Sequence, residues 1–538
     1  MDECRTLRCV WRKRGELKER FDVAVIGSGF AGSLMAMIAQ RLGLRAVLLE
    51  RGRHPRVVVG ESSTPLSNLL LEELATRYSL VNLRPLCKWG SWRESHPELA
   101  CGMKRGFSFF HHPQGHSGPV ARENQLLVAA SPHDAIADTH WYRADFDSYL
   151  AQEAQRLGVT YLDELEPRAF AEDEHESRFL GTRHGREIEL TARFVVDATG
   201  PRGFLHRSLR LGERDLPGMP LTAALYSHFS LVHRLEATGG VTLDGDPPYP
   251  VDDAAVHHIF DGGWVWVLRF SNGVTSAGIA ATDALAKELR LVEGEAAWER
   301  VLLRIPALRE QFQAATAIQP FRHIPRMGFR SALISGRNWA MLPSAAGFVD
   351  PLLSTGFPLT LLGVTRLARV LEHDWESERF ATRLNEYAAQ TDAELLAAAR
   401  LIGALYANFG NFPVFSALSL LYFAAASYAE AARRLGHTQL ASSFLLHDHR
   451  QFGAEAARVL EQAQCIRGTA DSQALIEEIR KVIEPIDVAG LTNFARRNWY
   501  PVDAEDLLRA AHKVGANRDE VAQMLERCGF NARAVPRV

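Results

Sequence analysis

Lysine is scarce in this chain of 538 residues, which has seven lysines against 54 arginines. A guanidinium stays protonated, whereas an amine readily loses its proton when it is buried, so the two residues are not interchangeable in chemistry. Two of the lysines lie in an aromatic stretch, in Lys88-Trp-Gly90 and Lys104-Arg-Gly106. Either one is a candidate for amine chemistry; the alternative is a surface lysine whose stem lies on a ring.

Other features that the sequence lacks exclude several classes of protein. The six cysteines show no Cys-x-x-Cys spacing, which predicts reduced thiols in a cytoplasmic protein. A net charge of −3 gives no basic excess, so we expect no nucleic-acid partner. The pair His447-Asp-His449 has no spaced partners, so no metal site is predicted. Residues 5–20 are too charged for the core of a signal peptide.

Long apolar runs are also rare. The longest in the C-terminal part, Pro413 to Ala429, has 17 residues and contains Ser416, Ser419 and Ser427. This length is near the lower limit for spanning a bilayer. We therefore expect no membrane span but a packed helix, in a helical region that covers the substrate entrance.

Near the start of the chain, a glycine-rich turn lies between a predicted buried strand and a predicted helix. The strand Val23 to Ile26 leads into Gly27-Ser-Gly29-Phe30-Ala31-Gly32, and a second apolar run, Ala46 to Leu49, ends at Glu50. In such a unit the glycines allow a tight turn and a close approach to a pyrophosphate, and the acid accepts hydrogen bonds from a ribose. The helix N-terminus favours the phosphate charge. The sequence therefore predicts a dinucleotide site.

Four later motifs extend this site. A second strand ends in Asp197-Ala-Thr-Gly200, more than 160 residues after the first turn, which distinguishes FAD folds from simple NAD folds. The others are Gly60-Glu-Ser62-Ser-Thr-Pro65, a helix start at Arg143, and Asp350-Pro-Leu-Leu-Ser-Thr355-Gly356. A helix after Gly356 can hold an anion at its N-terminus.

The middle of the chain is rich in predicted strands. Gly263-Trp264-Val-Trp266-Val-Leu-Arg269 places two large rings on one face, and Ser271-Asn-Gly273 turns the chain into a hairpin. Residues 80–120, by contrast, are predicted to be irregular. Whether the tryptophans pack a core or line a pocket stays open at this point.

These motifs, in this order and spacing, resemble those of the flavin-dependent halogenases. This family is part of the FAD monooxygenase group with the p-hydroxybenzoate hydroxylase fold, and the resemblance covers roughly residues 20–375. The motifs are GSGFAG, GESSTP, YRADFDSYL, VVDATGP, GGWVWVLRFSNG and FVDPLLSTG.

The resemblance implies an α/β fold made of a Rossmann-type FAD-binding domain, a β-rich substrate domain and a C-terminal helical region. The expected boundaries are a lead-in at 1–20, the first part of the FAD domain with a substrate-loop insert at 21–215, and the substrate domain at 216–320. The last part of the FAD domain is expected at 321–375 and the helical region at 376–538.

The resemblance also implies a reaction and its partners. A separate flavin reductase supplies FADH2, oxygen forms a flavin hydroperoxide, and chloride or bromide turns it into hypohalous acid. A lysine then places this electrophile beside an electron-rich aromatic substrate, phenol-like or pyrrole-like or held on a carrier.

Carried over by motif, the resemblance assigns a role to each site residue. Lys88 or Lys104 is the catalytic lysine, Trp264 and Trp266 contact the substrate, and Thr355-Gly356 is the halide cradle. The residues expected to bind FAD are Gly27, Gly29, Phe30, Ala31, Gly32, Glu50, Arg51, Ser62, Arg143, Asp197, Gly200, Asp350, Thr355 and Gly356.

The sequence departs from the family's pattern in three places, and the first of them keeps a second function open. The family's Trp-x-Trp-x-Ile-Pro ends in Leu268-Arg269 here, and Pro343-Ser344 replaces a Gly-Asp near the flavin. Leu353 stands where the tryptophan-halogenating branch has a glutamate, which argues against free tryptophan as the substrate. The alternative is an FAD monooxygenase that hydroxylates or epoxidises without halide and depends on neither lysine.

Overall fold

A parallel sheet carries the glycine-rich turn. The structure is a computed structural model that describes residues 18–115, 118–466 and 468–530. In spatial order the strands are β7 (Thr160–Leu162), β2 (Ala46–Leu49), β1 (Lys18–Ile26), β10 (Arg186–Asp197), β9 (Ser177–Arg183) and β8 (Leu165–Glu172), and β18 (Trp339–Met341) also pairs with β10. The strands β7, β2, β1, β10 and β18 are parallel, whereas β9 and β8 join antiparallel. Because β1 and β10 are parallel neighbours, the turns that follow them lie at the same edge.

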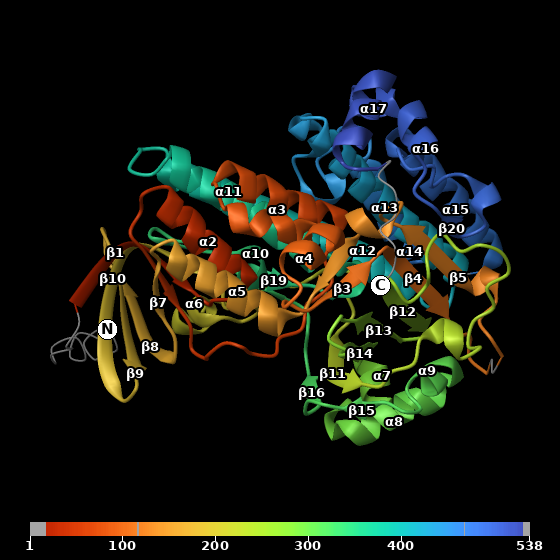
Figure 1. Cartoon of the computed structure of the whole chain (residues 1–538), viewed down its shortest axis with the longest axis horizontal. Coiled ribbons are helices and arrows are strands. Elements are labelled where there is room, and N and C mark those ends of the chain that lie inside the picture. The colour runs from red at the N-terminus through yellow and green to blue at the C-terminus, as the bar shows by residue number, and fades with distance from the viewer. Residues whose placement is uncertain (1–17, 116–117, 467, 531–538) are drawn as a thin grey trace.

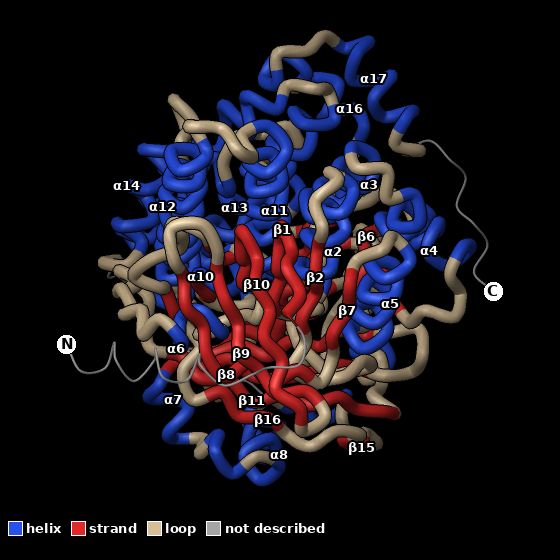
Figure 2. The backbone as a smooth tube through the Cα atoms, turned by 90° about the vertical axis from the view of Figure 1, so that its left-hand side faces the viewer, coloured by secondary structure: helices blue, strands red, loops and turns tan. Residues whose placement is uncertain are grey.

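Helices cover this sheet and bring further loops to that edge. Helix α2 (Phe30–Arg41) contacts β1, β2 and α5 (Arg143–Arg156), and α11 (Gly356–His373) contacts α2 and α3 (Pro65–Arg77). Figure 2 shows β10, β1, β2 and β7 side by side with these helices around them. Short elements complete this part: α6 (Phe204–Ser208), β17 (Phe329–Arg330), α10 (Pro343–Ala346) and β19 (Gly347–Phe348).

A second, mainly antiparallel sheet forms the other half of the molecule. Its order is β15 (Thr316–Ala317), β11 (Thr222–Ser230), β14 (Thr275–Thr282), β13 (Gly263–Arg269), β12 (Ala255–Phe260), β4 (Gly106–His111), β5 (Gln125–Ala129) and β20 (Trp499–Tyr500), and β16 (Arg322–Ile324) also pairs with β11. Strands β13 and β14 form the predicted hairpin. Figure 1 shows this sheet at the lower right, between α7–α9 and the C-terminal helices.

The two faces of the second sheet belong to different cores. Trp264 and Trp266 on β13 pack into the large core that includes β1, α11 and the C-terminal helices. Val265 and Val267, which alternate with them, pack on the opposite side against α8 (Glu295–Arg304) and α9 (Pro306–Gln311). This is the period of two that a sheet covered on both faces requires.

One expectation from the sequence is wrong. Residues 80–120 are not irregular: they contain α4 (Trp89–Ser95), β3 (Cys101–Lys104) and β4, and β3 pairs with β6 (Asp138–Trp141). The stretch expected to be β-rich also contains α7 (Asp283–Glu288), α8 and α9, and the helical region contributes β20. The domain boundaries stay a prediction, and most of the lead-in at 1–20 lies outside the described residues.

The C-terminal region packs on the second sheet as a group of helices. They are α12 (Phe380–Ala407), α13 (Phe412–Arg434), α14 (Gly453–Ala463), α15 (Thr469–Ile483), α16 (Ala504–Arg509) and α17 (Arg518–Arg527). In the described part of the chain, α13 is the one helix long and apolar enough to cross a membrane, but 83% of its apolar window is buried inside the protein. This burial agrees with a packed helix. The described cysteines, Cys87, Cys101, Cys465 and Cys528, are free thiols.

Phe415→Ala should destabilise the protein strongly, because Phe415 of α13 is fully buried and packs on Phe109 of the second sheet. Deleting a buried ring of this size costs about 3–5 kcal/mol of unfolding free energy. Urea denaturation of protein purified without detergent measures the loss. Leu303→Ala is the control, because that side chain is 66% exposed and should change stability by less than about 0.5 kcal/mol. Equal stability of the Phe415 variant and wild type would refute the packed helix.

Candidate active site

The turn between β1 and α2 has the backbone of a dinucleotide site. Gly27 has a φ of +97°, in the left-handed region that favours glycine. A Cβ on Gly32 would lie 1.8 Å from the carbonyl oxygen of Gly27. Both positions therefore require glycine for the turn itself, before any ligand is considered.

Positive charge converges on the N-terminus of α2. Gly29 is its N-cap residue, and a Cβ there would lie 3.4 Å from Nη2 of Arg143 and 3.6 Å from Nη2 of Arg56. Arg143 is held in place by Asp147, with two bonds of 2.8 Å, and by the Gly60 carbonyl at 2.9 Å. Two guanidinium groups beside free N–H groups form a fitting site for a pyrophosphate.

Glu50 ends β2 as an ionised acceptor. Its carboxylate accepts hydrogen bonds from the N–H and hydroxyl of Ser28, at 3.0 and 2.9 Å, and from the N–H of Gly52 at 2.9 Å. Burial by itself raises the pKa of Glu50, but the Arg56 guanidinium and these hydrogen bonds outweigh it and hold the pKa below its usual value. The neighbouring Arg51 is exposed. An ionised carboxylate here suits a ribose hydroxyl.

The carboxylate of Asp197 fixes the second turn by accepting hydrogen bonds from the residues that follow it. One carboxylate oxygen accepts hydrogen bonds from the N–H and hydroxyl of Thr199, at 2.9 and 2.6 Å, and the other from the N–H of Leu205 at 2.7 Å. Burial raises the pKa of Asp197. These bonds hold Gly200 at the edge of the sheet, with open space where its side chain would be.

The loop before α11 is held by a buried acid. Asp350 accepts hydrogen bonds from the N–H of Leu352 and from the Tyr406 hydroxyl of α12, both at 2.9 Å, and burial raises its pKa to about 7. Leu353 and Ser354 follow with φ of 61° and 55°, a backbone that is strained for residues with side chains. Such strain is characteristic of ligand sites.

After the strained turn there is a small opening at the N-terminus of α11. Thr355 is buried, whereas Gly356 is exposed and a Cβ on it would meet open space. Helix N-termini attract anions because their N–H groups are unpaired and their dipole is positive. Thr355 and Gly356 can therefore hold a halide.

The two lysines have different surroundings. Lys104 is fully buried and its Nζ lies 3.7 Å from the centre of the Phe107 ring. The amine donates hydrogen bonds to the Ser62 hydroxyl at 2.8 Å and to the Ser63 carbonyl at 2.5 Å, so Ser62 contacts this lysine. Burial lowers the pKa of Lys104 to about 7 against the opposing effect of Asp138. Lys88 is half-buried and donates to the Cys528 carbonyl at 3.2 Å.

An aspartate that sequence analysis missed lies beside Lys104. Asp138 of β6 is the cross-strand partner of Lys104 of β3. Its Oδ1 accepts a hydrogen bond from the Asn68 amide at 2.8 Å, and its Oδ2 has no partner among the described residues. Burial, with a contribution from Glu430, raises the pKa of Asp138 to about 7.

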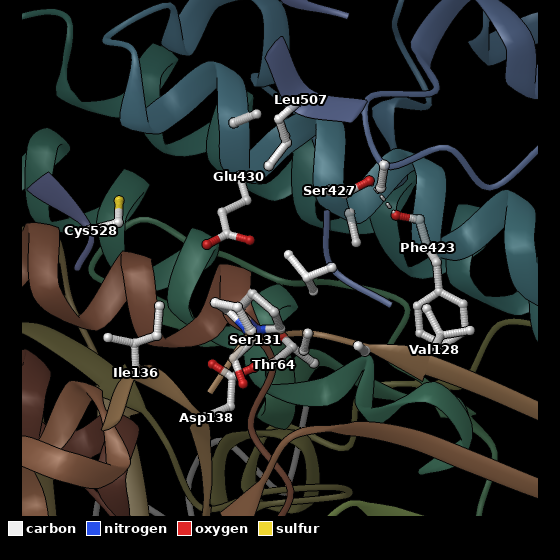
Figure 3. A pocket seen from close by; sticks show the side chains of 18 of the residues that line it. Thr64, Val128, Ser131, Ile136, Asp138, Phe423, Ser427, Glu430, Leu507 and Cys528 are labelled. Carbon is white, nitrogen blue, oxygen red and sulfur yellow. Dashed lines mark hydrogen bonds between the residues drawn. The ribbon is translucent and has the colours of Figure 1, made fainter. Parts of the chain in front are cut away.

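A pocket opens above this pair. Its volume is about 1360 Å³ with the space at its mouth included, and Figure 3 shows Asp138 and Thr64 at its base below Glu430 and Leu507. Helix α3, the second sheet and the C-terminal helices all contribute to its wall. The aromatic and aliphatic residues that line the pocket include Phe107, Val128, Ile136, Tyr422, Phe423 and Leu525. The C-terminal region thus forms the roof of the pocket. That it covers the substrate entrance stays a prediction.

Comparison with known proteins gives the family. The sequence model of the tryptophan halogenase family matches residues 127–408, which is more than half of the chain. The chain belongs to the tryptophan halogenase family.

Curated relatives of this halogenase are similar over most of the chain. Monodechloroaminopyrrolnitrin halogenase PrnC of Pseudomonas fluorescens is 26% identical over 70% of this chain and 66% of its own length. The match therefore spans just under two thirds of that relative. Tetracycline 7-halogenase of Kitasatospora aureofaciens is 27% identical over 75% of this chain and 73% of its own.

A solved structure shares the fold. Halogenase PltM, solved with phloroglucinol and FAD, superposes with a TM-score of 0.78 and is 22% identical over 89% of this chain and 99% of its own. The predicted α/β fold, the flavin-dependent halogenase family and the class of FAD-dependent oxidoreductase are confirmed. The family also favours halogenation over the alternative of hydroxylation or epoxidation.

Two residues expected to touch the substrate are buried in this halogenase. Trp264 and Trp266 lie 5.7 Å apart by ring centres on β13, and Trp266 donates to the Ser276 hydroxyl at 3.3 Å. They are not among the residues that line the pocket in the described part of the chain. Their substrate role stays a prediction. Among the described residues no group of three His, Cys, Asp or Glu side chains is placed to hold a metal ion.

Proposed function

We propose that Lys104, rather than Lys88, is the lysine that places the halogen electrophile beside a phenol-like or pyrrole-like ring in the pocket. The observation that carries this proposal is the buried amine of Lys104, which lies next to two pocket residues, Phe107 and Asp138. A lysine that is half neutral near pH 7 can act both as a nucleophile and as a proton donor. Lys88 itself lines the pocket, but it is only half-buried and its amine is bound to a backbone carbonyl.

The cofactor fits the residues at the edge of the first sheet. Arg143, Arg56 and the N-terminus of α2 would hold the pyrophosphate of FAD, and Glu50 would bind its ribose. Thr355 and Gly356 would hold chloride or bromide. When bound, reduced FAD supplies hypohalous acid from oxygen and the halide.

The protein's own residues then direct this oxidant. Ser62 and Ser63 hold the Lys104 amine, so that it can hydrogen-bond hypohalous acid or form a haloamine at a fixed place. Fixing the electrophile against the ring converts a diffusive encounter into a local one. The aromatic walls formed by Tyr422 and Phe423 exclude water, which would otherwise consume the oxidant.

The remaining partners are part of the same proposal. The sequence has a single Gly-x-Gly-x-x-Gly turn, which supports a separate flavin reductase as the source of FADH2. The substrate is a small aromatic molecule or one held on a carrier, since the open pocket leaves room for either. The free thiols support a cytoplasmic location.

Mass spectrometry of products tests this function. The enzyme is supplied with FAD, a flavin reductase, NADH, oxygen and a panel of phenols and pyrroles, with chloride, bromide or neither halide. We expect halogenated products that depend on the halide, with the mass and isotope pattern of the halogen supplied. Oxygenated products that form equally well without halide would show the monooxygenase instead.

A further inference from the structure

The base of the pocket contains a buried carboxylate oxygen that the fold leaves unpaired. Asp138 is 6% exposed, and Asn68 satisfies only its Oδ1. Its Oδ2 has no hydrogen-bond partner among the described residues, although the residue lines the pocket. Leaving a buried carboxylate oxygen unpaired costs free energy, and a hydrogen-bond donor on a ligand in the pocket would remove that cost.

Lys104 does not use this oxygen. Its amine donates instead to Ser62 and Ser63, and Oδ2 of Asp138 accepts no hydrogen bond from it. The two side chains are neighbours across paired strands, so they reach the same substrate from adjacent points. Lys104 is fully buried and is not among the residues that line the pocket in the described part of the chain, so a ring bound here meets the Asp138 carboxylate directly and has the amine beside it on the paired strand.

We propose that Asp138 accepts the proton of a ring hydroxyl or ring N–H while Lys104 delivers the halogen, so that the pocket selects aromatic rings carrying such a donor. This inference rests on the proposed function and names the class of substrate: a ring whose acidic O–H or N–H is conjugated with the carbon that is halogenated.

A second acid on the roof favours the same class of ligand. The carboxylate of Glu430 points from α13 into the pocket above Thr64 and Asp138 (Figure 3). Arg434 donates to Glu430 at 2.8 Å and holds the carboxylate at that position. Two carboxyl groups in a largely apolar pocket favour ligands that donate hydrogen bonds and disfavour electron-rich rings without a donor.

The step balances for a phenol. The O–H proton passes to Asp138 while the ring's electron pair forms the carbon–halogen bond and the halogen–oxygen bond of hypohalous acid breaks. The departing oxygen takes a proton from the Lys104 ammonium and leaves as water. The ring carbon then gives its proton to the Lys104 amine, and the ring oxygen regains its proton from Asp138. Both side chains return to their starting states. The raised pKa of Asp138 makes it a stronger base than an ordinary aspartate.

Asp138→Asn with two matched substrates tests the proposal. Resorcinol carries two ring hydroxyls, and 1,3-dimethoxybenzene has the same ring without a donor. We expect wild type to prefer resorcinol strongly, and the Asn variant to lose about 100-fold in the rate of resorcinol bromination, since a general base contributes 10²–10⁴. The variant also removes the charge that raises the pKa of Lys104, so bromination of the dimethoxy ring should fall as well, but by less than about tenfold, and the preference for resorcinol should shrink by about tenfold or more. Asp138→Ser gives a second test if the Asn variant does not fold.

Two controls separate this role from a structural one. Hypobromous acid formed without substrate is captured with monochlorodimedone, and its rate should be the same in both enzymes. Asp374→Asn removes another buried aspartate, at the end of α11, and should leave the substrate preference unchanged.

Each outcome decides a different question. Equal losses on both rings, or no loss on either, overturn the role of Asp138. If wild-type enzyme forms hypobromous acid but brominates neither ring, the proposed class of substrate is wrong. It is also wrong if wild type brominates only the dimethoxy ring. Absence of hypobromous acid in wild type with reduced FAD overturns the proposed function itself.

Discussion

Lys104→Met should abolish halogenated product, with a loss of about 1000-fold or more, while oxidation of FADH2 continues. The substitution keeps the length and apolar stem of the side chain and removes the amine that Ser62 and Ser63 hold. General acid–base and nucleophilic assistance of this kind contributes about 10²–10⁴ in rate. Product is measured by mass spectrometry, and FADH2 oxidation by absorbance. Hypohalous acid should escape and be captured by a trap in solution.

Lys88→Met is the comparison that identifies the catalytic lysine. We expect a loss of less than about tenfold, because the Lys88 amine is half-buried and bound to the carbonyl of Cys528. The opposite pattern, with product lost in the Lys88 variant and kept in the Lys104 variant, would reverse the roles. If both variants make halogenated product at the wild-type rate, neither lysine is catalytic.

Gly29→Val should weaken FAD binding by about 100-fold or more, which corresponds to about 2.7 kcal/mol. The added methyl groups would fill the space between α2, Arg143 and Arg56 that a pyrophosphate needs. The fold itself should persist, since the nearest atoms to a Cβ at this position are 3.4 to 3.7 Å away. Quenching of flavin fluorescence gives the affinity, and circular dichroism verifies folding.

Gly212→Val is the matched control for this variant. Gly212 is an exposed glycine at which a Cβ has its nearest contact at 3.9 Å, with a side chain that does not belong to the turn after β1. It should bind FAD as wild type does. If the Gly29 variant binds FAD as tightly as this control, the turn after β1 is not the pyrophosphate site.

The elements that local sequence determines were predictable. The run Ala46 to Leu49 is β2 at the residues expected, and the turn at Ser271 to Gly273 joins β13 and β14 as a hairpin. In both cases the signal lies within about 20 residues: apolar runs bounded by glycines or by a turn. The glycine-rich turn after β1 belongs to the same group.

The elements that distant pairing determines were not predictable. Strand β4 pairs with β12, about 150 residues later, and its neighbours include β5, which pairs in turn with β20. No pattern within residues 80–120 indicates these partner strands, so the sequence alone predicted an irregular stretch. Asp138 was missed for the same reason: its importance comes from Lys104, 34 positions earlier, on the strand that β6 pairs with.

The choice between Lys88 and Lys104 also required the fold. Both lie in a Lys-x-Gly setting beside aromatic residues. Burial distinguishes them, and burial depends on the loop at Ser62 and Ser63 closing over Lys104. A sequence motif gives the type of side chain, whereas the desolvation that tunes an amine comes from tertiary packing.

Strand β20 has a consequence for how the protein is made. Trp499 and Tyr500 pair with Leu127 and Val128 of β5, and thereby cover the edge of the second sheet. Until residue 500 has left the ribosome, β5 keeps an open edge able to pair with other nascent chains. The sheet that supports the pocket is therefore completed only after residue 500 has been synthesised, and expression at low temperature or with chaperones in excess should raise the yield of folded enzyme.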